Sequence, residues 1–256
     1  MPEKRRGLLI PVIMTLAALA VFISLGTWQI ERKAWKEGLI DTLTRRLEAQ
    51  PVELPGPADW ARLDAGNAEF RRVRLNVQFQ KAQDKAQDAL VYTSGSQIRD
   101  DVKGQGFFVF SPAKLPGGGT IVINRGFTPD KNYPPAEGSA QGIPQEIVGV
   151  LRWPEQPSWF TPDRDSAGTW YARDHLAMAQ AQGWGPVAPF YIEMEDPVPP
   201  GGVPHPSVLK VLLRNEHLQY AITWFGLAAV TVIMFAIWVR RRRETSADAS
   251  PPSSSP

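Results

Sequence analysis

The sequence contains no cysteine and only three histidines among its 256 residues. The absence of cysteine excludes structural disulfides, covalent haem attachment through a CxxCH motif, thiolate zinc sites and cysteine-based copper transfer. The histidines, His175, His205 and His217, are far apart in the sequence, and the five methionines are scattered, so no cluster has the spacing of a metal site. The basic clusters lie at the two ends of the chain, where they mark topology and give no indication of nucleic-acid binding.

Two long uncharged runs are present, one from Leu8 to Trp28 and one from Leu218 to Val239. At about 1.5 Å per residue, either run covers the roughly 30 Å hydrocarbon core of a bilayer. The alternative for the first run is a cleaved signal peptide. The run exceeds the usual apolar region of about 7–15 residues, and no small-x-small cleavage site follows it. We therefore predict transmembrane helices at 8–29 and 217–239.

Basic residues flank both runs on their outer sides, Lys4 to Arg6 before the first and Arg240 to Arg243 after the second. Because positive charge next to a span stays in the cytoplasm, both tails, 1–7 and 240–256, are expected there. The Ser- and Pro-rich end from Glu244 onward is expected to be disordered. No Arg- and Ser-rich transit peptide precedes the first run, so we expect a bacterial inner (plasma) membrane and a periplasmic central domain.

The region between the runs has its own pattern. Trp35, Leu39, Leu43 and Leu47 recur every four residues until Pro51, which predicts a membrane-proximal helix at 30–50. The Pro- and Gly-rich segment 197–216 is expected to be an extended linker to the second span.

A β-rich periplasmic domain is expected at 51–196, because short apolar or alternating runs recur between turn signals. The expected strands are 72–79, 89–94, 106–111, 119–127, 144–151 and 190–195. One helix is expected at 174–182, capped by Asp174. The fold class is an α+β membrane protein in which two transmembrane helices flank a mainly antiparallel β-sheet or partly closed barrel.

Two short segments indicate turns. Gly117 to Gly119 separates two expected strands and is typical of a hairpin. A phosphate-binding loop is discounted there, because no Lys-Ser/Thr follows and the next element is a strand. The polar repeat from Lys81 to Asp88 is expected to be a solvated turn.

His217 is the main candidate for chemistry, because it lies at the extracytoplasmic mouth of the second span. On a helix, Tyr220, Ala221 and Trp224 share its face, being three, four and seven residues further on. An imidazole at this depth could ligate a haem iron, with Trp224 packed on the macrocycle. The alternative is that a single histidine at a span end bonds headgroups, water or a backbone carbonyl.

Other residues at the same membrane level complete the candidate site. Trp28 and Gln29 end the first span at the height of His217, so we hypothesise that the helices pack there with Gln29 facing the site. Arg32 and Arg214, near the membrane surface, could meet haem propionates.

The remaining polar residues do not suggest an enzyme. His175 is expected on the solvated surface of its helix, and His205 is expected to have no role. Ser96, Asp100 and Asp101 share a polar stretch without a histidine partner. The pair Asp163 and Asp165 could act as two catalytic carboxylates, but aspartates in such loops mostly form turns.

Several blocks of the sequence form a recognisable ordered set over about residues 25 to 235. The blocks are Gly26-Thr27-Trp28-Gln29 with Arg32 and Lys33, Gly106 to Pro112, Ile121 to Phe127, Phe160-Thr161-Pro162 with Trp170-Tyr171 and Asp174, and Asn215, His217-Leu218, Tyr220-Ala221 and Thr223-Trp224. Together they resemble the Surfeit locus protein 1 family. Phe127 stands where that family often has Trp, which is a conservative departure.

The resemblance implies a non-enzymatic assembly factor for haem-copper cytochrome c oxidase. Such a factor would receive haem a near haem A synthase, hold it through the transmembrane helices and assist its insertion into oxidase subunit I. In that family, the histidine matched by His217 is the proposed ligand of the haem iron. The expected cofactor-binding residues are then His217, Trp224, Tyr220, Gln29, Trp28, Arg32 and Arg214.

Two alternatives stay open at this point. In the first, the β-rich domain is a scaffold that stabilises an oxidase assembly intermediate, and His217 only anchors its helix. In the second, the chain is a membrane-tethered sensor or envelope enzyme, which needs a polar pocket in the periplasmic domain. Arg125, in an expected turn at 124–126, is the best candidate for such a pocket, although an ion pair with Asp or Glu at a strand end is its simpler role.

Overall fold

The structure is a computed structural model that describes residues 3–80, 88–96, 98–132, 143–156, 159, 164–211 and 215–248. The chain forms two compact units. One consists of Met1–Leu39 together with Arg214–Pro256, and the other of Ile40–Leu213.

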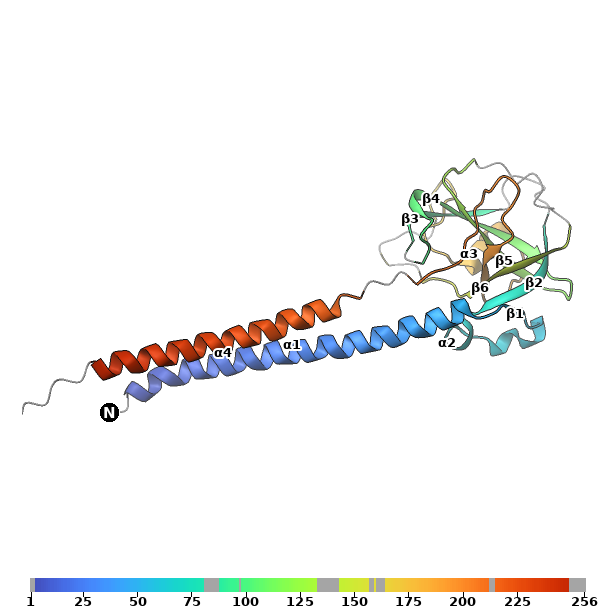
Figure 1. Ribbon diagram of the computed structural model, residues 1–256. Helices are drawn as coiled ribbons and strands as arrows, with labels where there is room; N and C mark the ends of the chain where they lie inside the picture. The colour runs from blue at the N-terminus through green and yellow to red at the C-terminus, as the bar shows by residue number, and fades with distance from the viewer. Residues whose placement is uncertain are drawn as a thin grey trace, which may run out of the picture. The chain divides into compact units, whose positions relative to one another are not determined.

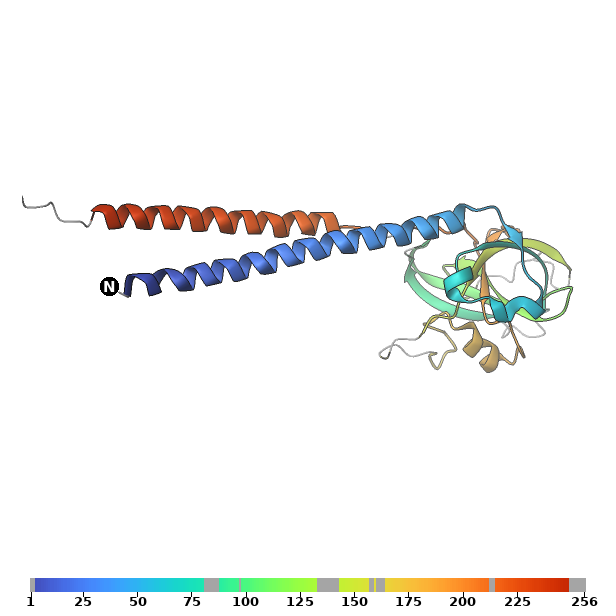
Figure 2. The same ribbon diagram turned by 90° about the horizontal axis from the view of Figure 1, so that it is seen from below.

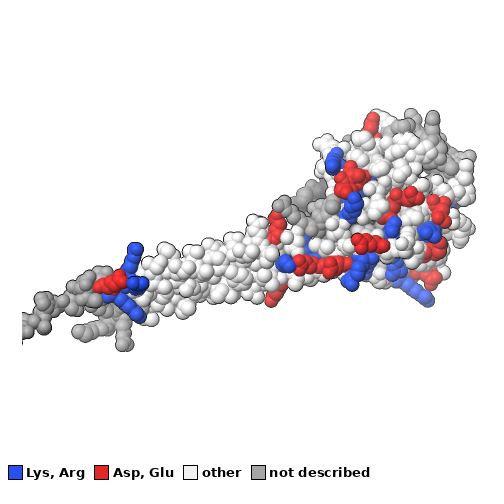
Figure 3. Space-filling view, in the orientation of Figure 1, with Lys and Arg blue, Asp and Glu red and all other residues white. Residues whose placement is uncertain are grey.

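The first unit is built on two long helices, α1 (Glu3–Glu48) and α4 (His217–Asp248) (Figure 1). Both are long and apolar enough to cross a membrane, and between its charged ends the helix pair presents an uncharged surface (Figure 3). Helix α1 runs without interruption through the predicted segments 8–29 and 30–50 and ends before Pro51. Helix α4 continues to Asp248, so the expected disorder from Glu244 is wrong as far as Asp248, and residues 249–256 lie outside the described residues.

The two helices meet along a seam with alternating spacings of three and four residues. On α4 the less exposed positions are His217, Ala221, Trp224, Ala228, Thr231 and Phe235. This spacing is that of a left-handed helix pair, which keeps one face of each helix against its partner.

Small side chains allow the backbones to approach closely along this seam. Gly26 of α1 is buried, and a Cβ atom there would lie 2.7 Å from the ring of Phe225. Ala221 and Ala228 of α4 are also buried. Because lipid tails are as apolar as the helices, such close packing is a main source of association between spans.

The second unit is a sheet of seven strands that partly closes into a ring (Figure 2). Strand β2 pairs with both β6 and β4, so β2, β6, β7, β5 and β4 form a closed circuit, with β1 and β3 attached to it. The strands are β1 (Val52–Glu53), β2 (Arg72–Phe79), β3 (Ala89–Gly95), β4 (Lys103–Lys114), β5 (Thr120–Thr128), β6 (Gln145–Arg152) and β7 (Tyr191–Asp196).

The predicted fold class is confirmed, as are the six expected strands to within a few residues at their ends. The pairings are antiparallel except β1 with β2 and β5 with β7, which are parallel. Strand β1 is not among the predicted strands, because a segment of two residues is too short to show periodicity.

The hairpin at Gly117–Gly119 joins β4 to β5 as expected, with Gly118 donating its N–H to the carbonyl of Leu115. Of the expected turn at 81–88, only Asp88 lies within the described residues.

Two apolar cores lie on the two faces of the sheet. The strict alternation of β2 places Val73, Leu75, Val77 and Phe79 on one face, where they pack with Ile121, Ile123, Ile192 and Phe190. Trp60, from the short helix η1 (Pro57–Arg62), contacts Phe190 edge to face in this core. On the other face, α3 (His175–Gln182) packs with Phe108, Phe110, Val122 and Tyr191. A one-turn helix, α2 (Ala65–Ala68), precedes β2.

The expected linker at 197–216 is partly folded into the β-rich unit, which corrects the prediction. The backbone of His205 pairs with that of Phe127 in both directions, and Leu209 is buried with Leu47 and Val150. A side chain at Gly126 would collide with the carbonyl oxygen of His205, so only glycine allows this contact. Residues 124–126 lie within β5 (Thr120–Thr128), so the expectation of a turn there is wrong.

Charged residues of the second unit form ion pairs. Arg125 is buried and lies 4.0 Å from Asp88, which confirms the ion pair expected for it. Asp100 pairs with Lys210 and Asp101 with the buried Arg99, so the polar stretch has a structural role. Asp165 accepts hydrogen bonds from the N–H of Thr169 and the hydroxyl of Tyr171, as a turn-forming aspartate does. Asp163 lies outside the described residues.

The expectation that His175 lies on a solvated surface is wrong. Helix α3 directs this side chain into the second core, where it is fully buried beside Tyr191. Its Nε2 lies 3.0 Å from the carbonyl oxygen of Ala188, to which it donates. Burial lowers the pKa of His175, because the charged imidazolium loses its hydration in the core.

Acidification should therefore destabilise the protein through His175. An unfolded histidine has a pKa of about 6.5. Below that pH the unfolded chain takes up a proton that the folded chain resists, so the free energy of unfolding falls as the pH falls. Thermal unfolding of the detergent-solubilised protein should show a smaller loss of Tm between pH 7.5 and 5.5 in His175→Gln than in wild type. His205→Gln, which changes an exposed imidazole, is the matched control and should keep the wild-type loss. An identical loss in wild type and His175→Gln would contradict the assignment.

Candidate functional site

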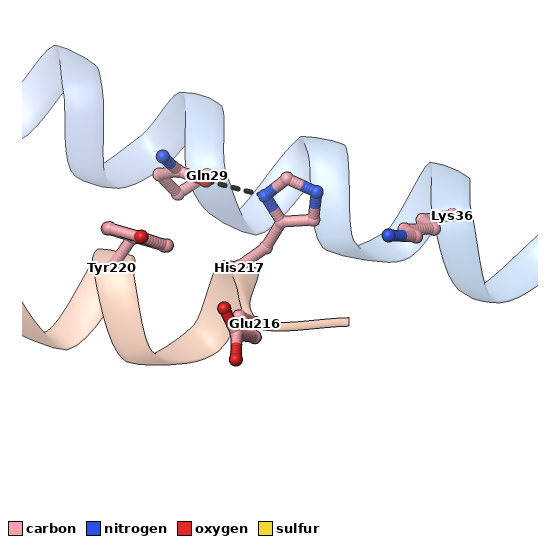
Figure 4. A pocket seen from close by; sticks show the side chains of 5 residues that line it. All are labelled: Gln29, Lys36, Glu216, His217 and Tyr220. Carbon is pink, nitrogen blue, oxygen red and sulfur yellow. Dashed lines mark hydrogen bonds between the residues drawn. The ribbon is translucent and has the colours of Figure 1, made fainter. Parts of the chain in front are cut away.

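The imidazole of His217 is held by a side chain of the opposite helix. Nδ1 of His217, the first residue of α4, lies 2.7 Å from Oε1 of Gln29 on α1 (Figure 4). The two residues are 188 positions apart in the sequence, so this contact depends on the pairing of the helices. The hypothesis that the helices pack at this height with Gln29 facing His217 agrees with this geometry.

The hydrogen bond determines which ring nitrogen is available to a ligand. An amide oxygen can only accept, so Nδ1 carries the proton and donates it to Gln29. In the neutral ring, Nε2 then carries a lone pair. It faces away from Gln29, toward the side of the pocket where Lys36 lies (Figure 4). Metal-binding histidines commonly have this arrangement, in which a second residue fixes the tautomer and the ring orientation.

An open cavity of about 260 Å³ adjoins this pair, lined by Gln29, Lys36, Glu216, His217 and Tyr220. Tyr220 is exposed and follows His217 along α4, toward the apolar part of the helix. Lys36 lies on the other side of His217, on α1, and Glu216 lies next to His217 at the start of α4 (Figure 4). The cavity is thus aromatic and apolar at one end and charged at the other.

Three other predicted site residues, Trp224, Trp28 and Arg32, do not line this cavity. Trp224 is half-buried and stacks on Phe22, with ring centroids 5.9 Å apart, so it belongs to the helix seam. Trp28 is exposed. The guanidinium of Arg32 lies 4.0 Å from the centre of the Trp35 ring. Arg214 lies outside the described residues.

Lys36 and Glu216 were missed by the sequence analysis, although a signal existed. Lys36 follows Gln29 by seven residues, one repeat of the seam, and Glu216 directly precedes His217. A seven-residue spacing keeps side chains on one face of a paired helix. The sequence does not show which residues of the two helices face each other. Lys36 and Glu216 could therefore be identified only from the structure, in which Gln29 faces His217.

The donor set fits the axial ligand of a metalloporphyrin better than a bare metal ion. Within the described ranges, no three His, Cys, Asp or Glu side chains gather in a way that could hold a metal ion. A metalloporphyrin supplies four equatorial nitrogens itself and needs only one axial ligand from the protein. A single oriented imidazole in an open, partly apolar cavity meets that requirement.

A second cavity, of about 270 Å³, lies in the β-rich unit between Tyr92–Ser94 and the segment with Tyr171 and Arg173. Arg125, which was considered for a polar pocket in this unit, is not among its lining residues. Arg173 lies 3.6 Å from Glu155, and its guanidinium packs over the Phe108 ring, so its charge is already partnered. The lining includes no histidine that could activate a nucleophile.

Comparison with known proteins identifies one family, both by a sequence profile and by individual relatives. The sequence profile described as the SURF1 family matches residues 16–229. A SURF1-like protein of Monosiga brevicollis is 34% identical over 247 residues, covering 93% of this chain and 90% of that protein. Surfeit locus protein 1 of Takifugu rubripes is 33% identical, covering 87% of this chain and 94% of its own. The human Surfeit locus protein 1 is 34% identical over 220 residues, covering 81% of this chain and 70% of its own.

Cysteine cross-linking can test the contact between the helices, because the natural chain has no cysteine. The double variant Gln29→Cys/His217→Cys should cross-link rapidly with a short bis-maleimide, which alkylates both thiols, in membranes. Trp28→Cys/His217→Cys is the matched control, since Trp28 is exposed and does not line the cavity. Equal rates for the two pairs, or no cross-link through position 29, would contradict the helix pairing.

Proposed function

Because the chain belongs to the SURF1 family, we propose that it is a membrane-anchored assembly factor for haem-copper cytochrome c oxidase. It holds haem a through His217 and assists its insertion into subunit I. The observation that supports the proposal most strongly is the hydrogen bond between His217 and Gln29, which leaves Nε2 available to an iron centre. The role is that of a carrier and not of an enzyme.

The open cavity suits a carrier that must release its cargo. A porphyrin with a long isoprenoid tail partitions into the bilayer, so a site on two transmembrane helices needs no enclosed soluble pocket. One axial ligand and an exposed rim favour release over permanent storage. A complex of picomolar affinity would need about 16 kcal/mol to dissociate, so intermediate affinity is expected.

The proposed topology would put His217 at a membrane level from which haem could pass between membrane proteins. We propose that both tails are cytoplasmic, since basic clusters flank the outer ends of the two spans. The β-rich unit is then periplasmic in a bacterial inner membrane, and His217 lies at the periplasmic end of its span. From that level, haem a released by haem A synthase reaches oxidase subunit I without crossing the bilayer.

Replacement of His217 tests the proposal directly. The detergent-purified protein, co-expressed with a haem A pathway, should contain haem a by its optical and pyridine-haemochrome spectra. His217→Ala should lose the haem or shift its spectrum, because the axial nitrogen is gone. Haem absent from both proteins, with both folded and still bound to oxidase subunits, would instead favour a scaffold that stabilises an assembly intermediate.

Gln29 is expected to act as a positioning residue for His217. Gln29→Leu removes the acceptor for Nδ1–H, so the ring loses its fixed tautomer and orientation. Loss of such a partner typically lowers metal affinity by about 10–100-fold, and the haem bands should shift as the axial bond weakens. Gln29→Glu, which keeps an acceptor oxygen, should retain binding. Unchanged affinity and spectrum in Gln29→Leu would show that the hydrogen bond does not position the ligand.

A further inference from the structure

The chemical character of the side chains around His217 changes along the seam of the helix pair. On α1, Phe22, Gln29 and Lys36 follow each other at intervals of seven residues, or about 10 Å. Phe22 stacks on Trp224 at the apolar end, Gln29 holds His217, and Lys36 lies at the charged end. The same face therefore changes from aromatic, through the ligand position, to cationic.

A haem shows the same change from an apolar edge to a charged edge. Its ring is apolar, and its two carboxylates extend from one edge. If the iron is held at Nε2 of His217, the apolar edge matches the Tyr220 end of the cavity and the carboxylate edge matches the Lys36 end (Figure 4). We propose that Lys36 binds a carboxylate of the porphyrin and thereby orients the cargo and selects for its free acid. This inference rests on the proposed function.

Two neighbouring cations of α1, Lys33 and Arg32, do not line the cavity, whereas Lys36 does. This assignment replaces Arg32, which the sequence analysis considered for the propionates.

Glu216 gives the site a second, opposing charge. It lines the same cavity as Lys36, so the porphyrin carboxylates bind in a cavity that also holds a carboxylate of the protein. A compact ammonium on a flexible stem also lacks the bidentate grip of an arginine. Both features limit affinity at the carboxylate edge, as expected for a cargo that is handed on.

The test compares two porphyrins that differ only at the carboxylates. The full-length apo protein in detergent is titrated with ferric protoporphyrin IX and with its dimethyl ester, and axial ligation is followed by the Soret band. Lys36→Ala should weaken binding of the free acid by roughly threefold to tenfold, as expected for one charged contact near solvent. Binding of the ester should not change. Lys36→Arg, which keeps the positive charge, should restore the preference for the free acid over the ester.

Two further variants complete the design. Lys33→Ala removes a nearby cation outside the cavity and should leave both affinities unchanged. Glu216→Gln removes the negative charge that lines the cavity and should strengthen binding of the free acid only. Cross-linking of Gln29→Cys/His217→Cys in the Lys36→Ala background shows whether the helix pair is still assembled.

The outcomes separate this inference from the proposed function. If wild type binds neither porphyrin, or binds both without dependence on His217, the carrier function and the role of Lys36 both fail. If binding depends on His217 but Lys36→Ala changes the affinities for acid and ester equally, or changes neither, only the role of Lys36 is overturned.

Discussion

The hydrogen bond from Nδ1–H of His217 to Oε1 of Gln29 joins the first turn of one long apolar helix to the other. It forms only if the two helices are paired at the correct height. The small residues of the seam, above all Gly26 against Phe225, make that pairing close enough. In turn, the bond fixes the tautomer of the imidazole and directs Nε2 into a cavity that has an apolar and a charged end. The ligand position, its orientation and the polarity of its surroundings therefore all depend on one polar contact within an otherwise apolar pair.

This arrangement supports the proposed function, in which the protein transfers a cofactor and does not use it. A permanent haem site usually encloses the ring and often supplies two axial ligands. Here one imidazole is available, and the cavity is open and accommodates both Lys36 and Glu216. The β-rich unit is held together by two apolar cores and by ion pairs such as that of Arg152 with the buried Glu193.

Much of the fold could be predicted because its signals are local. Apolar runs indicated both long helices, and the alternation in 72–79 predicted β2 with its buried face. What failed depends on contacts that are distant in sequence. His175 was placed on the surface because an eight-residue helix does not reveal which face packs on Tyr191 and Phe110. The segment around His205 has the sequence of a linker, and its pairing with Phe127 joins residues that are far apart in the sequence. In the site, His217 and Gln29 were identified by depth and family resemblance, whereas Lys36 required the register between the helices.

The most direct test of the central claim is the protonation pattern of the His217 ring in the apo protein. Long-range proton–nitrogen NMR correlation on protein labelled with 15N-histidine resolves the ring nitrogens, and His217→Gln assigns the signal among only three histidines. The account predicts a single neutral tautomer with the proton on Nδ1 and an unprotonated Nε2, which becomes a mixture in Gln29→Leu. A ring protonated on Nε2, or a tautomer mixture already present in wild type, would contradict it.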